Sequence, residues 1–287
     1  MILVADSGST VTDWCLLDTN SNEKKYFKTR GLNANYLTKK EMQEIIQNEL
    51  KPKLPYSTIN SITNVYFYGS GCSTEKKQEK VRSQIAVLTP NAAIVTDHDL
   101  LGAAISICRD DMGIVCILGT GSNSCVYDGK EVKKTLLSLG YLLGDEGSGT
   151  YIGKKILYYY LKNKMPKELT EIFYYKYKKH PEDMVAEMYA APKTGAYLAQ
   201  FSHFASEHIK EPFIENIIEN CFRDFVKEQV LQYEEAKYYP IGFVGSIAAV
   251  FQKQLQTILE EFELKLGKII QNPIEGLAEY HLKRGKE

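Results

Sequence analysis

The sequence predicts an α/β protein of two domains, and three observations carry this prediction. Strand-like and helix-like segments follow the order β-β-β-α-β-α-β-α through the first third of the chain, which favours a mixed sheet covered by helices. A turn of small and hydroxylated residues between two apolar strands occurs near residue 6 and again near residue 119. The chain of 287 residues is long enough for two domains. The repeated strand–turn–strand pattern is a weak internal repeat. It predicts two similarly built domains that face one another across a cleft, where ligands usually bind.

The composition is that of a soluble globular protein, with 44% hydrophobic and 25% charged residues. The net charge of −1 offers no general attraction to nucleic acid or to an anionic membrane. No apolar run reaches the roughly 18 residues of a membrane span. Asp6 interrupts the apolar stretch at the N-terminus, so we expect no secretory signal. Six cysteines without a C-x-x-C pair predict reduced thiols in a cytoplasmic protein rather than disulfides or a zinc site.

The first third of the chain alternates between strand and helix signals. Strands are expected where apolar and aromatic residues run between turn residues, over 1–5, 13–18, 25–29, 64–71 and 92–99. Helices are expected where apolar residues recur at helical spacing or follow a capping residue, over 38–50, 73–85 and 99–109. Thr38 is the expected N-cap of the first helix, and Asp99 begins the third.

The strand–turn–strand pattern returns over 112–130, where Asp128-Gly129 is a hairpin signal. The chain is then expected to be mostly helical from about 148 to 236, with long amphipathic runs over 194–209 and 212–233. The remaining segments alternate again between strand and helix. A strand within 240–255 passes through Gly245-Ser246 into a helix, and 266–281 supplies a last strand and a terminal helix.

Two turns have the residue types of a phosphate cradle. "DSGST" (6–10) can present consecutive backbone N–H groups to an anion, and Asp6 could hold Mg²⁺ directly or through water. The same residue types are common in plain hairpin turns. "LGTGSN" (118–123) is a second such turn, and it lacks the full G-x-G-x-x-G and following helix of a dinucleotide site. The pair together favours nucleotide phosphates held from both domains.

Several polar residues lie where strands end or helices begin. Asp97 and Asp99 are in this position, and Asp99 could be a helix N-cap or the general base that deprotonates a hydroxyl nucleophile in phosphoryl transfer. Asp145-Glu146 could accept hydrogen bonds from sugar hydroxyls, or could simply begin a helix capped by Ser148 or Thr150. The asparagines of "GLNANYL" (31–37) lie in a loop that is either a plain turn or a substrate contact.

In this order the motifs resemble the sugar kinase/heat-shock chaperone/actin superfamily. Within it the chain is similar to the BadF/BadG/BcrA/BcrD-type ATPases, and most of all to their N-acetylglucosamine kinase branch. The resemblance covers nearly the whole chain. The matching segments are "DSGST" (6–10), the loop 31–35, "DLLG" (99–102), "GTGSN" (119–123), "GDEG" (144–147) and "VGS" (244–246).

The resemblance implies an α/β fold of two ribonuclease H-like (actin-like ATPase) domains that flank a central cleft. Residues 1–108 would form the N-terminal domain, completed by the C-terminal helix at about 274–287. Residues 109–273 would form the C-terminal domain, with helical additions.

The resemblance also implies roles for individual residues. Asp99 would be the catalytic base, and Asp6 would hold Mg²⁺, with or without an intervening water. The residues that would contact the sugar are Asn35, Asp97, Thr120 and Asp145. Those that would hold ATP and its phosphates are Ser7, Gly8, Ser9, Thr10, Gly119, Gly121, Ser122, Asn123, Gly245 and Ser246. Val11 stands where many relatives carry a basic residue, so one phosphate contact is missing here.

The implied activity is ATP- and Mg²⁺-dependent phosphorylation of an amino sugar, N-acetylglucosamine at its 6-OH, by a cytoplasmic homodimer. N-acetylmuramate and glucosamine stay open as substrates. One alternative is the activator ATPase of a dehydratase, which needs cysteine ligands for an iron–sulfur cluster; no such pattern is visible in the sequence. The other is a non-catalytic sugar- or nucleotide-binding regulator. Asp99 and the two turns argue against that second alternative.

Overall fold

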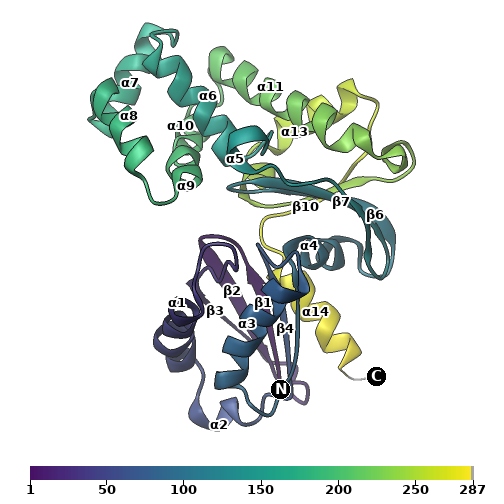
Figure 1. Ribbon diagram of the computed structural model, residues 1–287. Coiled ribbons are helices and arrows are strands. Elements are labelled where there is room, and N and C mark those ends of the chain that lie inside the picture. Colours follow the sequence, from purple (N-terminus) through teal and green to yellow (C-terminus); the bar gives the residue numbers. More distant parts are fainter. Residues whose placement is uncertain (286–287) are drawn as a thin grey trace. The chain divides into compact units, whose positions relative to one another are not determined.

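The computed structural model describes residues 1–285, and the chain divides into two compact units (Figure 1). Unit 1 consists of residues 1–112, 127–132 and 272–287, and unit 2 of residues 113–126 and 133–271. The strands form two five-stranded sheets, of order β3-β2-β1-β4-β5 and β8-β7-β6-β9-β10. The two orders correspond strand for strand, so the repeat seen in the sequence is a repeat of the sheet. The expected α/β fold is confirmed.

The first sheet begins with two hairpins and ends with two crossovers. Its strands are β1 (Ile2–Ser7), β2 (Val11–Leu17), β3 (Lys24–Arg30), β4 (Asn64–Gly69) and β5 (Ala93–His98). β2 is antiparallel to β1 and β3, whereas β4 is parallel to β1 and β5 is parallel to β4. The carboxyl ends of β1, β4 and β5 therefore lie at one edge of the sheet, where ligands of open α/β sheets bind.

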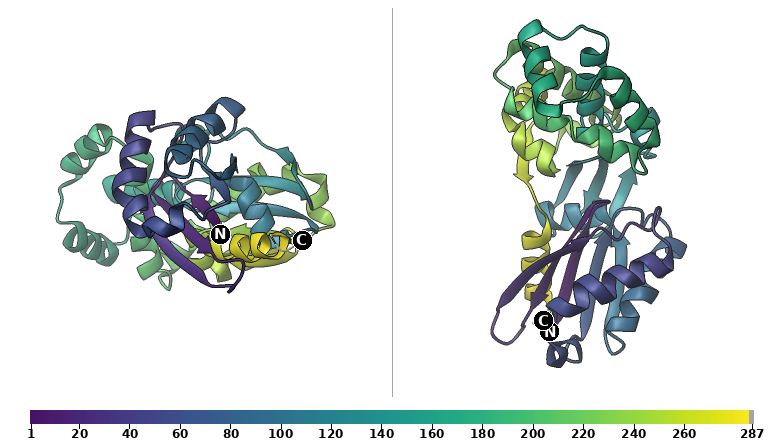
Figure 2. Two further views of the ribbon diagram at one scale, coloured as in Figure 1. Left: turned by 90° about the horizontal axis from the view of Figure 1, so that it is seen from below. Right: turned by 90° about the vertical axis from the view of Figure 1, so that its left-hand side faces the viewer.

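Helices cover both faces of this sheet (Figure 2). One face carries α1 (Lys39–Ile45), the π-helical turn η1 (Ile46–Leu50), the 3₁₀ turn η2 (Lys51–Lys53), α2 (Tyr56–Ile59) and α3 (Glu75–Leu88). The other face carries α4 (Asp99–Cys108) and α14 (Ile274–Arg284). Trp14 and Phe67 are fully buried on the first face, in a core that extends to Ile46 and Ile85. As expected, Thr38 caps α1, in a reciprocal arrangement with Glu41.

The second sheet repeats this order with shorter outer strands. Its strands are β6 (Met112–Leu118), β7 (Ser122–Asp128), β8 (Val132–Thr135), β9 (Ile241–Val244) and β10 (Leu266–Ile270). β9 is parallel to both β6 and β10. The expected hairpin at Asp128-Gly129 is present, and Gly129 has φ +93°. β8 itself was not predicted, because its residues are mostly exposed and show no apolar alternation.

Helices make up most of unit 2. They are α5 (Gly140–Leu143), α6 (Gly149–Leu161), α7 (Lys167–Tyr177), α8 (Pro181–Ala190), α9 (Thr194–Ala199), α10 (Ser202–Glu207), α11 (Pro212–Glu228), η3 (Val230–Gln232), η4 (Glu234–Lys237), α12 (Ser246–Val250) and α13 (Gln252–Glu261). The expectation of one long run over 194–209 was wrong, because a tight turn at Phe201, whose N–H donates to Leu198, separates α9 from α10. None of the helices within residues 1–285 has the length and apolar character needed to cross a membrane.

Cysteine placement agrees with the expectation of unpaired thiols. None of the six cysteines forms a disulfide, and five of them are buried. Burial raises the pKa of the Cys15 thiol to about 11 and of the Cys72 thiol to about 12. These side chains therefore pack as small apolar groups rather than acting as nucleophiles.

The close packing of α6 against α9 makes a testable prediction. A Cβ added at Gly153 in α6 would lie 1.9 Å from the carbonyl oxygen of Leu198, so backbone would have to move. Gly153→Ala should lower the free energy of unfolding by about 1–3 kcal/mol. Gly195→Ala in α9 is the matched control, because its nearest neighbour would lie at 3.6 Å; it should cost nothing or stabilise slightly. Equal losses for the two variants in urea unfolding would contradict this packing.

Candidate active site

The turn between β6 and β7 is attached to the beginning of α6. The N–H of Gly119 donates to Gly121 (3.0 Å), and the N–H of Gly149 donates to Gly119 (2.8 Å). The Thr150 hydroxyl donates to the carbonyl of Thr120 (2.6 Å). Thr120 itself is exposed. The expected "LGTGSN" turn is therefore a rigid structure that presents the Thr120 side chain to solvent.

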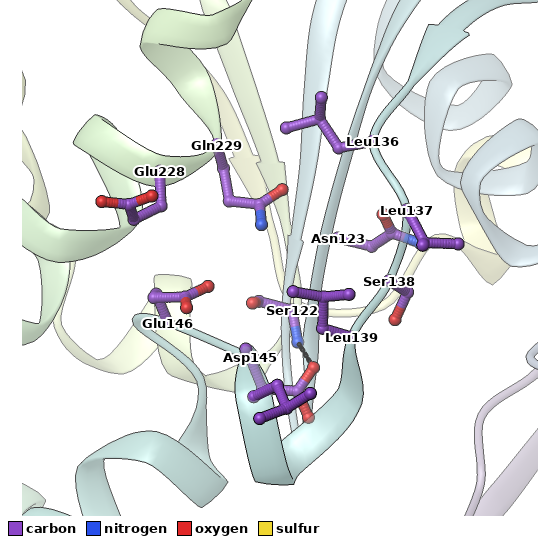
Figure 3. A pocket seen from close by; sticks show the side chains of 12 residues that line it. Ser122, Asn123, Leu136, Leu137, Ser138, Leu139, Asp145, Glu146, Glu228 and Gln229 are labelled. Carbon is purple, nitrogen blue, oxygen red and sulfur yellow. Dashed lines mark hydrogen bonds between the residues drawn. The ribbon is translucent and has the colours of Figure 1, made fainter.

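Asp145 lies against this turn. Its carboxylate accepts the backbone N–H of Ser122 (3.4 Å), and a Cβ added at Gly121 would lie 3.1 Å from its Oδ2 (Figure 3). Asp145 is a non-glycine residue with φ +62°, a conformation that costs energy and is common at functional sites. Burial raises the pKa of its carboxyl above the usual value. Ser148, one of the two capping candidates, caps α6 by accepting the N–H of Tyr151 (3.1 Å).

The turn after β9 packs against the end of β6. Gly245 has φ +123°, and a Cβ there would lie 2.2 Å from the carbonyl oxygen of Leu118, so only glycine fits. Ser246 follows it as the exposed first residue of α12. The Asn123 side chain accepts the N–H of Ser124 (2.9 Å). Unit 2 thus gathers the expected residues of the segment 119–123 with Asp145 and Gly245.

In unit 1, the turn between β1 and β2 is closed by one hydrogen bond, from the N–H of Gly8 to Val11 (2.9 Å). Ser7 is fully buried, and its hydroxyl lies 2.8 Å from that of Thr12. Both hydroxyl oxygens accept the N–H of Leu32, at 3.0 and 3.2 Å. The Ser7 side chain therefore holds the loop that follows β3, while Ser9 and Thr10 form the outer part of the turn.

The loop 31–35 packs directly on this turn. A Cβ added at Gly31 would lie 2.3 Å from the carbonyl oxygen of Gly8, which leaves no room for a side chain. The buried Asn33 amide donates to the Ser9 hydroxyl (2.8 Å) and accepts the N–H of Asn35 (2.8 Å). The Asn35 side chain is exposed. Asn33 is thus a scaffold that places Asn35 beside the turn.

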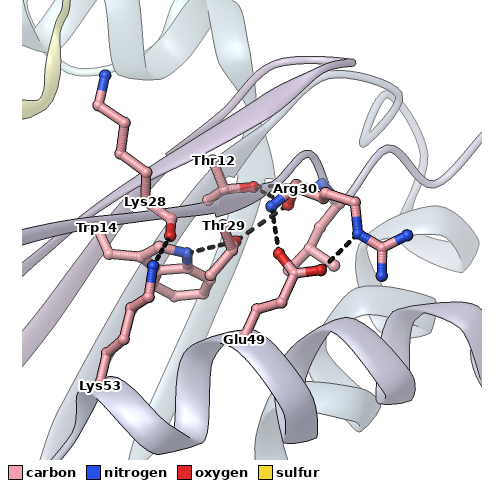
Figure 4. A network of polar contacts seen from close by, with 8 residues as sticks. Thr12, Trp14, Lys28, Thr29, Arg30, Glu49 and Lys53 are labelled. Carbon is pink, nitrogen blue, oxygen red and sulfur yellow. Dashed lines mark hydrogen bonds and ion pairs between the residues drawn. The ribbon is translucent and has the colours of Figure 1, made fainter.

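A polar network anchors the strand that leads into this loop (Figure 4). The Glu49 carboxylate accepts the backbone N–H of Arg30 (2.8 Å) and is also paired with its guanidinium. The Trp14 indole donates to the Thr29 hydroxyl (3.0 Å). Since Arg30 directly precedes Gly31, these contacts fix where the loop begins.

Asp99 is held at the carboxyl end of β5. Its Oδ2 accepts the Ser70 hydroxyl (2.6 Å), and its Oδ1 accepts the N–H of Leu100 (3.0 Å). The N-cap of α4 is His98, whose Nδ1 accepts the N–H of Leu101 (3.1 Å). The capping role considered for Asp99 therefore belongs to its neighbour. The Asp97 carboxylate accepts the N–H of His98 (2.7 Å).

The Asp6 carboxyl of unit 1 has a strongly raised pKa. Burial, and after it the negative charges of Asp99 and Asp13, raise the pKa of Asp6 to about 8. Asp13 lies opposite Asp6 in the register of β1 and β2, and it also pairs with Lys28 (3.0 Å). Within the described residues, no group of three or more His, Cys, Asp or Glu side chains is placed to hold a metal ion, so a cation here would be held by few carboxylates and by water or phosphate, as Mg²⁺ prefers.

Sequence reasoning missed Asp13 and Ser70. The position of Asp13 could have been predicted from the hairpin. Asp6 and Asp13 lie at equal distances before and after the turn, and the pairing of the two strands places such residues opposite each other. Ser70 directly follows β4 as Asp99 directly follows β5, and these strands are parallel neighbours. Their hydrogen bond could only be expected once that pairing was known.

No protein-family model matches the chain, and no curated protein matches it. Among solved structures, one from Porphyromonas gingivalis, described as a "Putative N-acetylglucosamine Kinase", is 37% identical over 99% of this chain and 100% of that chain, with a TM-score of 0.94. A second protein of the same description, from Chromobacterium violaceum, is 16% identical over 97% of this chain and 98% of that chain, with a TM-score of 0.76.

A glucokinase of the ROK family from Streptomyces griseus, solved with glucose and AMPPNP, has a TM-score of 0.53 at 11% identity, over 97% of each chain. At such identities the second and third likenesses show the fold alone, which the chain shares with these two proteins. The first likeness shows more, since it extends over the whole of both chains at 37% identity. The protein therefore belongs to the family of the Porphyromonas gingivalis protein.

Proposed function

We propose that the protein is an ATP-dependent sugar kinase that phosphorylates N-acetylglucosamine at its 6-OH. Kinship with the Porphyromonas gingivalis protein supports the reaction class and the sugar. The observation that carries the proposal is the placement of the Asp99 carboxylate. It accepts a hydrogen bond from the Ser70 hydroxyl, and its negative charge adds to the effect of burial in raising the pKa of Asp6. A finer membership, in the BadF/BadG/BcrA/BcrD-type ATPases, is part of the same proposal.

Asp99 is the base in this proposal. The Ser70 hydroxyl and the N–H of Leu100 each take one of its oxygens, which fixes the plane of the carboxylate. Each carboxylate oxygen keeps lone pairs that are not used in these hydrogen bonds. One of them can accept the proton of the sugar 6-OH while the 6-oxygen of the sugar attacks the γ-phosphorus of ATP and ADP leaves. Such positioned proton transfer contributes a factor of about 10²–10⁴ in enzymes.

The other residues divide by the chemistry they offer. The outer residues of the two turns, Ser9 and Thr10 in unit 1 and Gly121 and Asn123 in unit 2, would contact the phosphate oxygens. Gly8 and Gly119 would shape these turns, because their N–H groups close the turns by donating to Val11 and Gly121. Gly245 and Ser246 present a small-residue surface for the adenosine. Asn35, Thr120 and Asp145, with Asp97 as a further candidate, offer amide, hydroxyl and carboxylate groups for the sugar hydroxyls.

Asp6 would hold Mg²⁺, directly or through water, with Asp13 beside it. The fit rests on the raised pKa of Asp6, which burial causes first and the charges of Asp99 and Asp13 increase, because a bound cation would favour the charged carboxylate against both effects. When bound, Mg²⁺ neutralises charge on the phosphates and so makes the γ-phosphorus easier to attack. The protein's own part is to present the carboxylates and to orient the acceptor hydroxyl.

We also propose that the enzyme works in the cytoplasm as a homodimer. Six cysteines without a disulfide suit a reducing compartment. The homodimer stays a prediction drawn from the resemblance, and gel filtration with light scattering would test it.

Replacement of Asp99, the proposed base, should lower kcat strongly and leave ATP binding nearly unchanged. Asp99→Asn keeps the shape and removes the proton acceptor, so kcat should fall by about 10²–10⁴ while the KM for ATP changes by less than about threefold. Asp97→Asn is the matched control, two residues away at the end of the same strand; it should keep most of kcat and alter the KM for the sugar. The reverse pattern in a coupled ADP-release assay would assign the base to Asp97.

The same assay identifies the substrate. ADP release should depend on added sugar and should be fastest with N-acetylglucosamine among N-acetylglucosamine, N-acetylmuramate, glucosamine and N-acetylmannosamine. Mass spectrometry of the product should show one phosphate on the sugar. ATP turnover that is independent of sugar and unaffected by Asp99→Asn would refute a sugar kinase.

Asp6 should destabilise the metal-free fold at neutral pH. Its carboxyl is protonated in the folded state below about pH 8, whereas the unfolded chain loses that proton near pH 3.8, so this group lowers the free energy of unfolding as pH rises between those values. Without Mg²⁺ and ATP, Asp6→Asn should therefore be more stable than wild type at pH 8, by about 1–3 kcal/mol, and equal to it at pH 4. The variant should nevertheless be inactive.

Asp18→Asn is the control for this comparison. Asp18 is fully exposed, and hydrogen bonds from the N–H groups of Asn20 and Ser21 lower its pKa. Its exchange should give no gain in stability at pH 8. A gain of equal size for both variants, measured by urea unfolding at the two pH values, would show that Asp6 is not specially strained.

A further inference from the structure

His98 ends β5 and stands directly before α4, the helix whose first residue is the proposed base Asp99. The residue before a helix often accepts a backbone N–H of the first turn, because these N–H groups have no partner within the helix. Asparagine, aspartate, serine and threonine are the usual residues in this role. Here a histidine ring has it, and its Nδ1 accepts the N–H of Leu101 (3.1 Å). The cap of α4 is therefore a group of unusual type, directly beside the base.

The hydrogen bond to Leu101 fixes the state of the His98 ring. A ring nitrogen can accept an N–H only when it carries no proton itself, so the ring is neutral and its one proton lies on Nε2. Nε2 lies 3.6 Å from Oδ1 of Asp97, and the same oxygen accepts the backbone N–H of His98 (2.7 Å). One edge of the ring thus serves the helix, and the other edge faces Asp97.

The body of α4 is fixed by packing, but its first turn depends on caps. A Cβ added at Gly102 would lie 2.7 Å from Cβ of Tyr68, so the helix is seated directly on β4 from this residue onward. Before it, the N–H of Leu100 is accepted by the Asp99 carboxylate (3.0 Å) and the N–H of Leu101 by His98. Helix ends fray where such bonds are lost, so removal of the His98 cap would loosen the turn from 99 to 101.

Loosening of this turn would move the base itself. Asp99 is the first residue of α4, so the turn that His98 closes sets the backbone position from which its carboxylate reaches out. The Ser70 hydroxyl holds only one oxygen of that carboxylate (2.6 Å) and does not fix the backbone behind it. A displacement of about 1 Å in a reacting group can cost about 10²-fold in rate.

We infer that His98 is a positioning residue, whose Nδ1 closes the first turn of α4 and thereby aims the Asp99 carboxylate at the acceptor hydroxyl. The inference rests on the proposed function, because it needs Asp99 to be the base. It also gives the two neighbouring acids different places. Oδ1 of Asp97 is engaged by the backbone of His98, whereas Asp99 is held by the helix and by Ser70. His98 acts through α4 and leaves the proton transfer to Asp99.

Two amide variants separate the two edges of the ring. The side-chain oxygen of asparagine can stand where Nδ1 of His98 stands, whereas the longer glutamine reaches toward the place of Nε2 and is not a preferred cap. His98→Asn should therefore keep kcat with N-acetylglucosamine within about threefold of wild type. His98→Gln should lower kcat by about ten- to hundredfold, because the base is displaced. The KM for ATP should change by less than about threefold in both variants.

His180→Gln is the matched control. His180 also directly precedes a helix, α8, but its exposed side chain forms no capping hydrogen bond. Its exchange should change neither kcat nor the midpoint of urea unfolding. If the cap of α4 were merely structural, His98→Gln would lower the urea midpoint and leave the kcat of the folded enzyme unchanged. That result, or a loss of kcat in His98→Asn with kcat kept in His98→Gln, would overturn the inference.

Nitrogen-15 NMR of the imidazole tests the geometry without any turnover. The chain has five histidines, so the ring signals of His98 can be assigned as those missing from the spectrum of His98→Asn. At mildly alkaline pH and without ligands, wild type should show an unprotonated Nδ1 and a protonated Nε2 for this ring. A proton on Nδ1 would overturn the inference while leaving a sugar kinase intact. Failure of wild type to phosphorylate any sugar would instead refute the proposed function, and with it the role of His98 toward a base, even if the spectrum showed the cap.

Discussion

The two buried hydroxyls of Ser7 and Thr12 hold the candidate site of unit 1 together. They join both arms of the β1–β2 hairpin to the backbone of Leu32, so the phosphate-type turn and the loop 31–35 are one rigid piece. The turn after β4 belongs to the same piece, because the N–H of Ser70 donates to the Ser7 carbonyl (2.8 Å). Since Ser70 also holds Asp99, the proposed base is positioned from the same centre as the proposed phosphate turn.

The two sheets have the same strand order, but the side chains around their turns differ in chemical type. In each, a small-residue turn joins the first two strands, and a glycine with positive φ follows the fourth strand of that order: Gly71 at +82° after β4 and Gly245 at +123° after β9. In unit 1 these turns are surrounded by carboxylates, which suits a metal and an acceptor hydroxyl. In unit 2 the first turn lies against Asp145, and the glycine of the second turn lies against Leu118 and Gly119.

Residues whose role depends on neighbours in the sequence could be predicted, and residues whose role depends on sheet pairing could not. The β-β-β-α order, the cap at Thr38 and the turns around Gly8 and Gly119 follow from local pattern, and the structure has them. Ser70 was missed because it meets Asp99 only through the pairing of β4 with β5. The hydrogen bond from the Ser124 hydroxyl in β7 to Gln229, which directly follows α11, likewise depends on tertiary packing and has no signature in the local sequence.

Unit 1 is made of segments that lie before and after unit 2 in the sequence, and this order affects how unit 1 folds during synthesis. α14, at residues 274–284, packs on β1, β2 and α4, and its buried His281 stacks on the ring of Tyr66 and pairs with the hydroxyl of Tyr68. β1 thus leaves the ribosome before unit 2 is made, while the helix that completes its cover is made after unit 2. Until then, only α4 can cover the face of the sheet that carries Asp6 and Asp13. A chaperone that binds exposed apolar strands would meet its substrate in that interval.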